Sequence, residues 1–150
     1  MRGGAWATGT LLSLVGFSFL IGVEAMTEDE LKQRTKGFAL RILQLVEALP
    51  KTTAGRTIGN QLVRSGTSVG ANYRAACRGR SKADFTAKLG IVIEEADESG
   101  YWLELIIEGK LLPQERIAPL LAEANELTAI MVASVHTAQT NQKSKLKTQK

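Results

Sequence analysis

Residues 57–78 read TIGNQLVRSGTSVGANYRAACR, and this stretch decides the fold class. Apolar and small residues recur at intervals of three and four from Ile58 to Ala76, which predicts one continuous helix. Three glycines lie inside it: Gly59, Gly66 and Gly70. Because a glycine inside a helix costs on the order of 1 kcal/mol relative to alanine, we interpret them as sites where another helix approaches closely. A helix broken by a loop near Gly66 is the alternative.

Three other segments with the same helical period flank this stretch. They cover about 27–49, 81–108 and 113–139, and the first connection is expected at 51–56. Thr27 and Ser81 have the sequence context of N-caps, whereas Pro50 and Gly109 are typical of helix ends. Four long helices with short links predict an all-α, up-down-up-down antiparallel four-helix bundle over residues 26–140.

The two ends of the chain differ from this bundle in composition. Residues 1–25 form an apolar leader with the outline of a signal peptide or of a short membrane anchor. A third interpretation, which we favour, is an extension from an upstream start, with Met26 beginning a cytoplasmic domain; only a retained leader would bring the chain to a membrane. Residues 141–150 form a lysine-rich tail that we expect to be disordered.

The net charge of +4 over 150 residues conceals two regions of opposite sign. Residues 31–88 carry twelve basic and two acidic side chains, a net charge of +10, whereas 89–140 carry two basic and nine acidic ones, a net charge of −7. This asymmetry indicates an internal electrostatic match, an anionic partner, or both. Residues 26–140 sum to zero, so the pI of about 9.4 does not by itself argue for nucleic acid.

The densest group of basic side chains lies at the end of the second predicted helix and in the turn after it. Its members are Arg74, Arg78, Arg80 and Lys82. Such a cluster can contact the phosphates of RNA or DNA and would make binding sensitive to salt. Alternatively, these cations pair with the four acids between Glu94 and Glu98, or remain solvated at the C-terminal end of their helix. Weaker candidates, on expected exposed helical faces, are Lys32, Lys36, Arg41 and Lys51.

Arg64, Asn72 and Tyr73 stand among small residues of the second predicted helix. We expect them to form a hydrogen-bond network between helices or subunits that maintains the register, in preference to contacting a ligand. Aromatic residues make up only 5% of the chain, too few for a base-stacking platform. Any binding of nucleic acid should therefore depend on backbone electrostatics.

The inventory of reactive side chains excludes several kinds of site. One Cys and one His cannot supply a zinc, haem or iron–sulfur centre. A di-iron bundle needs Glu-x-x-His pairs, and Ala133 stands three positions before His136. No base accompanies Cys77 or the serines in the pattern of a nucleophilic triad. We therefore expect no catalytic residue, no metal and no cofactor.

Four segments together are similar to one protein family. They are TEDEL from Thr27, RTKGFALRI from Arg34, RSGTSVGANYRAACRGRSKADF from Arg64 and EEADESGYWLELI from Glu94. Over about residues 27–138 the chain resembles the four-helix-bundle proteins encoded by intervening sequences in bacterial large-subunit ribosomal RNA genes. Accessory proteins of diversity-generating retroelements are related members.

The resemblance implies assembly into a ring, which is a homopentamer in known relatives. In the retroelement relatives it also implies a basic surface that binds nucleic acid and a reverse transcriptase. The family has no established catalytic residues, so none is transferred to this chain.

Two functions from different classes fit the sequence. The first is a non-enzymatic, self-associating bundle that binds nucleic acid as an accessory protein, with Arg74, Arg78, Arg80 and Lys82 as the contacts. The second is a structural or protein-interaction scaffold with no nucleic-acid role, which the acidic third helix supports. We expect a cytoplasmic location, or export if residues 1–25 are a true signal peptide.

Overall fold

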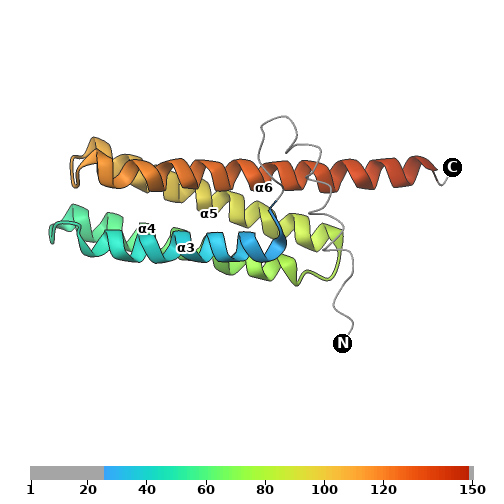
Figure 1. Cartoon of the computed structure of the whole chain (residues 1–150), viewed down its shortest axis with the longest axis horizontal. Coiled ribbons are helices and arrows are strands. Elements are labelled where there is room, and N and C mark those ends of the chain that lie inside the picture. The colour runs from blue at the N-terminus through green and yellow to red at the C-terminus, as the bar shows by residue number, and fades with distance from the viewer. Residues whose placement is uncertain (1–25, 149–150) are drawn as a thin grey trace.

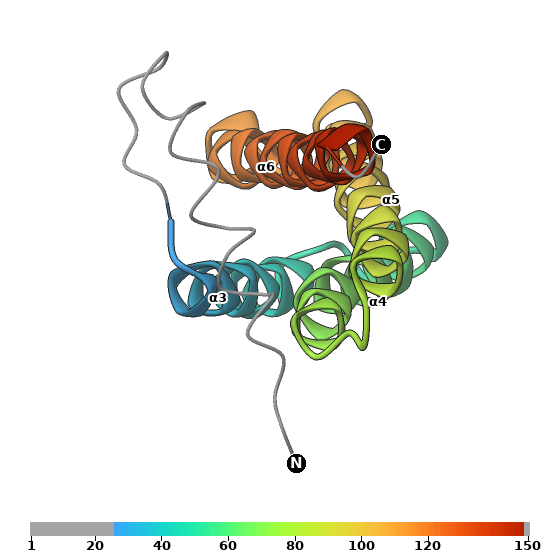
Figure 2. The same cartoon turned by 90° about the vertical axis from the view of Figure 1, so that its right-hand side faces the viewer.

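The structure, a computed structural model, describes residues 26–148 and the side chains of residues 26–140. Within that part of the chain the helices are α3 (Glu28–Glu47), α4 (Thr53–Cys77), α5 (Lys82–Glu108) and α6 (Gln114–Thr148). They alternate in direction and follow one another around the bundle, so α3 lies diagonally opposite α5 (Figure 1, Figure 2). The predicted all-α four-helix bundle is confirmed. The predicted leader lies outside the described residues.

Local signals in the sequence set the helix ends. Thr27 caps α3 in a capping box: its hydroxyl accepts the Glu30 N–H at 3.2 Å, and the Glu30 carboxylate accepts the Thr27 N–H at 2.7 Å. The Ser81 hydroxyl caps α5 by accepting the Asp84 N–H at 3.1 Å. Gly109 is the C-cap of α5, as predicted.

The beginning of α4 differs from the prediction. The sequence predicts a loop over 51–56, but α4 begins at Thr53, after Thr52, whose hydroxyl accepts the Gly55 N–H at 3.1 Å. Gly55 is typical of a loop, yet it lies in the first helical turn, where the backbone of Pro50 passes very close to it. A Cβ at Gly55 would lie 2.0 Å from the carbonyl oxygen of Pro50, so only glycine leaves room for this entry into the helix.

The C-terminal end of α6 also differs from the prediction. The sequence predicts a helix end near Gln139 and a disordered tail, whereas the helix continues to Thr148. No glycine or proline occurs after Gln139, and the lysines, glutamines and leucine there are good helix formers, so nothing local stops the helix. As a result, α6 projects beyond the end of the bundle at which α3 begins (Figure 1).

The glycines inside α4 lie where α3 packs against it. The helix is continuous across them, as predicted. A Cβ at Gly66 would lie 2.2 Å from the Cδ1 atom of Ile42, and a Cβ at Gly70 would lie 3.4 Å from the backbone of Thr35. The prediction of close helix approach is confirmed, because α3 occupies the space that larger side chains on α4 would need.

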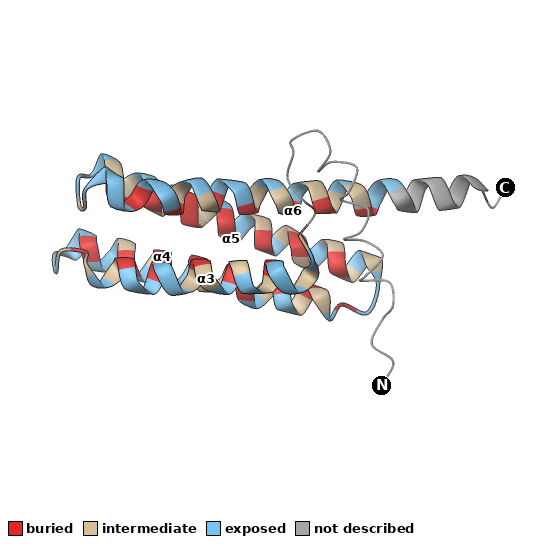
Figure 3. Ribbon diagram, viewed as in Figure 1, coloured by how far each residue is buried: buried red, intermediate tan, exposed pale blue. Residues whose placement is uncertain are grey.

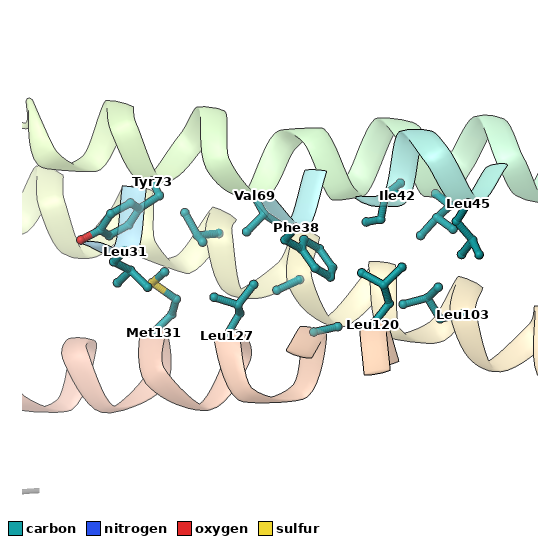
Figure 4. Close-up of a cluster of buried hydrophobic side chains, with 14 of the residues drawn as sticks. Leu31, Phe38, Ile42, Leu45, Val69, Tyr73, Leu103, Leu120, Leu127 and Met131 are labelled. Atoms are coloured by element: carbon teal, nitrogen blue, oxygen red, sulfur yellow. The ribbon is translucent and has the colours of Figure 1, made fainter. Parts of the chain in front are cut away.

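One largely aliphatic core runs between the four helices, whose buried residues face inward (Figure 3, Figure 4). Of the helices that are neighbours around the bundle, α3 and α6 are the least closely packed pair. Large buried side chains such as Phe38 and Leu127 fill the space between them. At the surface, Arg34 and Arg41 of α3 both pair with Glu123 of α6 and so connect the two helices.

Candidate nucleic-acid interface

The four cations predicted to contact phosphate lie at one end of the bundle. Arg74 is in the last turn of α4, Arg78 is the C-cap, Arg80 is in the turn, and Lys82 is the first residue of α5. The three arginines are exposed, and Lys82 is half-buried. Within the described part of the chain, none of the four forms an ion pair within 4.0 Å, although the Arg80 N–H donates to the Asp84 carboxylate at 3.0 Å.

Two of these cations line an open cleft of about 510 Å³ between the end of α4 and the beginning of α3. The residues that line it are Asp29, Lys32, Gln33, Lys36, Arg74 and Arg78. Arg80 and Lys82 are not among them. The structure therefore combines two arginines of the predicted cluster with Lys32 and Lys36, which the sequence ranks as weaker candidates. Lys32 and Lys36 lie beside the two arginines because of the antiparallel register of α3 and α4, and no sequence motif reveals that register.

The cleft stays positively charged after its internal ion pairs are considered. Lys32 pairs with Glu28 at 2.5 Å, which raises the pKa of the ammonium group, and its Nζ lies 3.9 Å from a carboxylate oxygen of Asp29. The other three cations of the cleft have no acidic partner within 4.0 Å among the described residues. Three unpaired cations around one opening suit an anion that carries several charges.

The acids of α5 do not neutralise this group. Arg64 of α4 pairs instead with Glu95, at 3.2 Å between Nη1 and Oε2, and with Glu98. The Glu98 carboxylate also accepts the indole N–H of Trp102 at 3.0 Å. Part of the internal match between the basic and acidic halves is therefore made by Arg64. Within the described part of the chain, Arg74 and Arg78 at the end of α4 form no ion pair.

The contacts of Glu98 predict a pH-dependent contribution to stability. Hydrogen bonds from Arg64, and next from Trp102, lower the pKa of Glu98. A carboxyl group with a lowered pKa in the folded state stabilises the fold above its unfolded pKa, about 4.3, and loses this effect as the pH falls through the folded pKa. We expect Glu98→Gln to lower the Tm at pH 7 in low salt and to have a smaller effect at pH 3. Thermal unfolding followed by circular dichroism measures both, and equal Tm differences at the two pH values would contradict the assignment.

Arg64, Asn72 and Tyr73 do not form one hydrogen-bond network within the chain. Arg64 bonds to α5, whereas the Asn72 amide donates to the backbone carbonyl of Ser68 in its own helix at 2.9 Å. Tyr73 is buried, burial raises the pKa of its hydroxyl, and the neighbour that contributes next is the Cys77 thiol of the same helix. The three side chains leave α4 in different directions, since each residue turns the helix by about 100°.

A buried hydroxyl pair, absent from the sequence predictions, connects α4 and α5. The hydroxyls of Ser65 and Ser99 lie 2.9 Å apart, and the Ser99 hydroxyl is also 2.8 Å from the carbonyl oxygen of Glu95. Because both groups are buried and satisfied, the pair helps to determine how α4 and α5 align. In the sequence, the feature that could have indicated this contact is a Ser followed by a Gly at 65–66 and again at 99–100.

The described residues form no cluster of metal ligands, and their cysteine thiol is not activated. They contain no group of three or more side chains that could hold a metal ion. Burial raises the pKa of the Cys77 thiol to about 11, so the reactive thiolate is scarce at neutral pH. His136 is exposed on α6.

One described helix is long and apolar enough to span a membrane by composition alone. It is α6 over Gln114–Thr140, whose most apolar 18-residue stretch has a mean hydropathy of 1.2. Ile117, Leu127 and Met131 of this segment are buried against the other helices. The core of the bundle therefore accounts for part of the apolar composition of α6, since 33% of its most apolar 18-residue stretch is buried.

Comparison with known proteins agrees with this architecture. The sequence profile of the 23S rRNA-intervening sequence proteins matches residues 27–133, which include the cleft and the turn after α4. The chain belongs to this family. The resemblance carried by the four sequence segments is thereby confirmed for the 23S rRNA-intervening sequence proteins.

A solved structure with the same fold is the crystal structure of a protein of unknown function from the S23 ribosomal protein family of Bacteroides thetaiotaomicron VPI-5482. It is 35% identical in sequence to this 23S rRNA-intervening sequence protein, with a TM-score of 0.65. The similarity covers 69% of this chain and 96% of that chain. None of the curated proteins matches the chain.

Proposed function

We propose that this chain is a non-enzymatic, self-associating bundle that binds the phosphate backbone of nucleic acid at the cleft between α3 and α4. The observation that supports it is a group of three cations, Lys36, Arg74 and Arg78, around one opening of about 510 Å³, which have no acidic partner among the described residues. Since these cations break no internal ion pair when a phosphate binds, counterion release remains available as the driving force. Arg80 and Lys82, just beyond the cleft, would extend the contact along a longer strand.

Contact with the backbone rather than with the bases is expected. Among the described residues, no aromatic side chain lines the cleft, so bases have nothing to stack on there. Arginine and lysine bind phosphates of any sequence. We therefore propose binding with little base preference and with affinity that falls steeply as salt is added.

The cleft is tested by a double variant, Arg74→Gln with Arg78→Gln. We expect weaker binding of a single-stranded RNA oligonucleotide, and a plot of log K against log salt that is shallower by about 1.4, since each lost phosphate contact removes about 0.7. Fluorescence anisotropy across a salt series measures both quantities.

The matched control is Arg56→Gln with Arg116→Gln, which removes the same charge from exposed residues at the opposite end of the bundle. It should bind more tightly than the cleft variant and retain the original salt slope. An equal loss in both variants, or no binding by the unchanged protein at low salt, would reject the cleft as a phosphate site.

Self-association is the second part of the proposal. The family resemblance implies a homopentamer, and the large apolar side chains that are exposed on α3 and α5 are typical of protein contact surfaces. We propose that the assembly acts in the cytoplasm, with RNA or DNA as one partner. A reverse transcriptase is a candidate second partner only where one is encoded nearby, as in the related retroelement systems.

The second candidate function is a protein-interaction scaffold that does not use nucleic acid. The same exposed apolar side chains favour it, because they fit a protein surface better than a polyanion. Co-purification with and without nuclease separates the two functions. A partner protein that stays bound after nuclease treatment, together with no RNA or DNA affinity at low salt, would favour the scaffold.

A further inference from the structure

The last helix, α6, continues past the rest of the bundle. Among the residues whose side chains the structure describes, Ala138 is the last buried one, and the helix goes on to Thr148. We call residues 139–148 the α6 arm. With a rise of about 1.5 Å per residue the arm is about 15 Å long. It projects from the end of the bundle at which α4 ends and α5 begins (Figure 1).

The composition of the arm suits a polyanion. Its sequence, QTNQKSKLKT, contains three lysines, at positions 143, 145 and 147, and no acidic residue. The last acidic residue of the chain is Glu126, and the only large apolar residue of the arm is Leu146. A helix of this kind has no apolar face to bury against a protein, whereas its charge attracts phosphates.

More cations lie at the foot of the arm. Arg80 is in the turn before α5, and Lys82 is the first residue of α5, the helix that packs beside α6. Figure 2 looks onto this end of the bundle, with the arm on one side and the turn on the other. The nearby acid Asp84 is already engaged, because it pairs with Lys88 and accepts the Arg80 N–H at 3.0 Å. Phosphates would therefore meet uncompensated positive charge here.

The size of the arm matches the major groove of B-form DNA. An α-helix with its side chains is about 10–12 Å across, and the groove is about 12 Å wide. At 100° per residue, positions 143 and 147 share one side of the helix and position 145 lies on the opposite side. Lysine positions on both sides suit a groove that is bordered by two phosphate strands. Double-stranded RNA fits less well, because its major groove is deep and narrow.

The spacing of the helices places the foot cations under one of these strands. The edge of the groove is about 6 Å from its centre, and helices that pack side by side have axes about 8–10 Å apart. A strand that borders a groove filled by the arm therefore passes over the beginning of α5, where Lys82 lies.

We propose that the α6 arm binds in the major groove of double-stranded DNA, with Arg80 and Lys82 on the phosphates of one bordering strand. The inference rests on the phosphate binding in the proposed function and names its ligand as duplex DNA. The cleft between α3 and α4 opens at the same end of the bundle, so Arg74 and Arg78 can contact the backbone farther along the duplex.

A variant without the charges of the arm, Lys143→Gln with Lys145→Gln and Lys147→Gln, tests the ligand. Its affinity for a short DNA duplex should fall at least about tenfold, and its plot of log K against log salt should be shallower by about 2.7, since each lost contact to B-DNA removes about 0.9. Its affinity for the RNA duplex of the same sequence should fall much less. Fluorescence anisotropy in a salt series measures all three quantities.

The matched control is Lys51→Gln with Arg56→Gln and Arg116→Gln, which removes the same charge from exposed residues at the opposite end of the bundle. This variant should bind the DNA duplex more tightly than the arm variant and keep the original salt slope. Equal losses on the DNA and RNA duplexes in the arm variant, or equal losses in the arm variant and the control, would overturn the inference.

A second variant, Ser144→Pro, tests the helix while the charge stays the same. Proline inside a helix breaks it, and this position lies beyond the core, so the Tm of the bundle should not change. We expect DNA affinity at least about tenfold lower and RNA-duplex affinity unchanged. The unchanged protein should also protect guanine N7, which lies in the major groove, from methylation by dimethyl sulfate, and Ser144→Pro should not.

These outcomes separate the arm from the cleft. If Ser144→Pro binds DNA as the unchanged protein does, or if the unchanged protein leaves guanine N7 open to methylation, the arm does not occupy the groove. Weaker binding only in the variant Arg74→Gln with Arg78→Gln would keep the proposed function and reject the arm. No binding of any nucleic acid at low salt would reject both.

Discussion

Replacing Phe38 by alanine is expected to lower the free energy of unfolding by about 3–5 kcal/mol. The Phe38 side chain is 0% exposed and belongs to the same core cluster as Val69 and Leu127 (Figure 4). The cavity left by the ring cannot close by a shift of α3, because Ile42 is packed against Gly66 and holds α3 on α4. The loss of the buried ring and the cavity that remains both lower the free energy of unfolding.

Urea unfolding followed by circular dichroism at one protein concentration measures this change. Val132→Ala is the control, because it removes apolar atoms from a side chain that is 36% exposed, and we expect it to cost below about 1 kcal/mol. A similarly small loss for Phe38→Ala would mean that the core collapses around the missing ring, against the packing described above.

Replacing Gly55 by alanine is expected to cost about 2–3 kcal/mol, although alanine is the better helix former. The added Cβ would lie 2.0 Å from the carbonyl oxygen of Pro50 and 3.1 Å from its carbonyl carbon. Both atoms belong to the backbone, so the whole connection between α3 and α4 must shift. That shift would also disturb the hydrogen bond from the Gly55 N–H to Thr52, which caps α4.

Gly37→Ala is the matched control for this change. Gly37 lies inside α3, and a Cβ there would meet nothing within 4 Å. We expect this substitution to stabilise the protein by about 0.5–1 kcal/mol, because alanine loses less conformational freedom on folding. The same unfolding measurement should therefore give effects of opposite sign for the two glycines. A neutral or stabilising Gly55→Ala would contradict the close approach of Pro50.

Much of the fold could be predicted because its signals are local. The spacing of apolar residues around Ile58 and Leu62 predicts α4, and the capping box at Thr27 predicts where α3 begins. The predictions failed where a residue was selected for a tertiary contact and not for its local conformation. Gly55 is a residue type that is common in loops. Here it lies inside a helix, and its lack of a side chain leaves room for the backbone of Pro50.

The candidate site was predictable only in part. Arg74 and Arg78 are one helical turn apart, so the sequence alone shows that they share a face. Lys36 is distant in the sequence and joins them only because α3 and α4 are antiparallel with a particular register. That register depends on how closely the two backbones approach, and therefore on Ile42 packing against Gly66.

By itself, the sequence determined the four helices, their order and the division of the bundle into a basic and an acidic half, because these properties depend on residues close together in the chain. Only the tertiary structure decided which charges neutralise one another. Arg64 pairs with Glu95 and Glu98, whereas Arg74 and Arg78 remain without acidic partners among the described residues. An ion pair between two helices requires their side chains to come within about 4 Å, and that distance is set by packing.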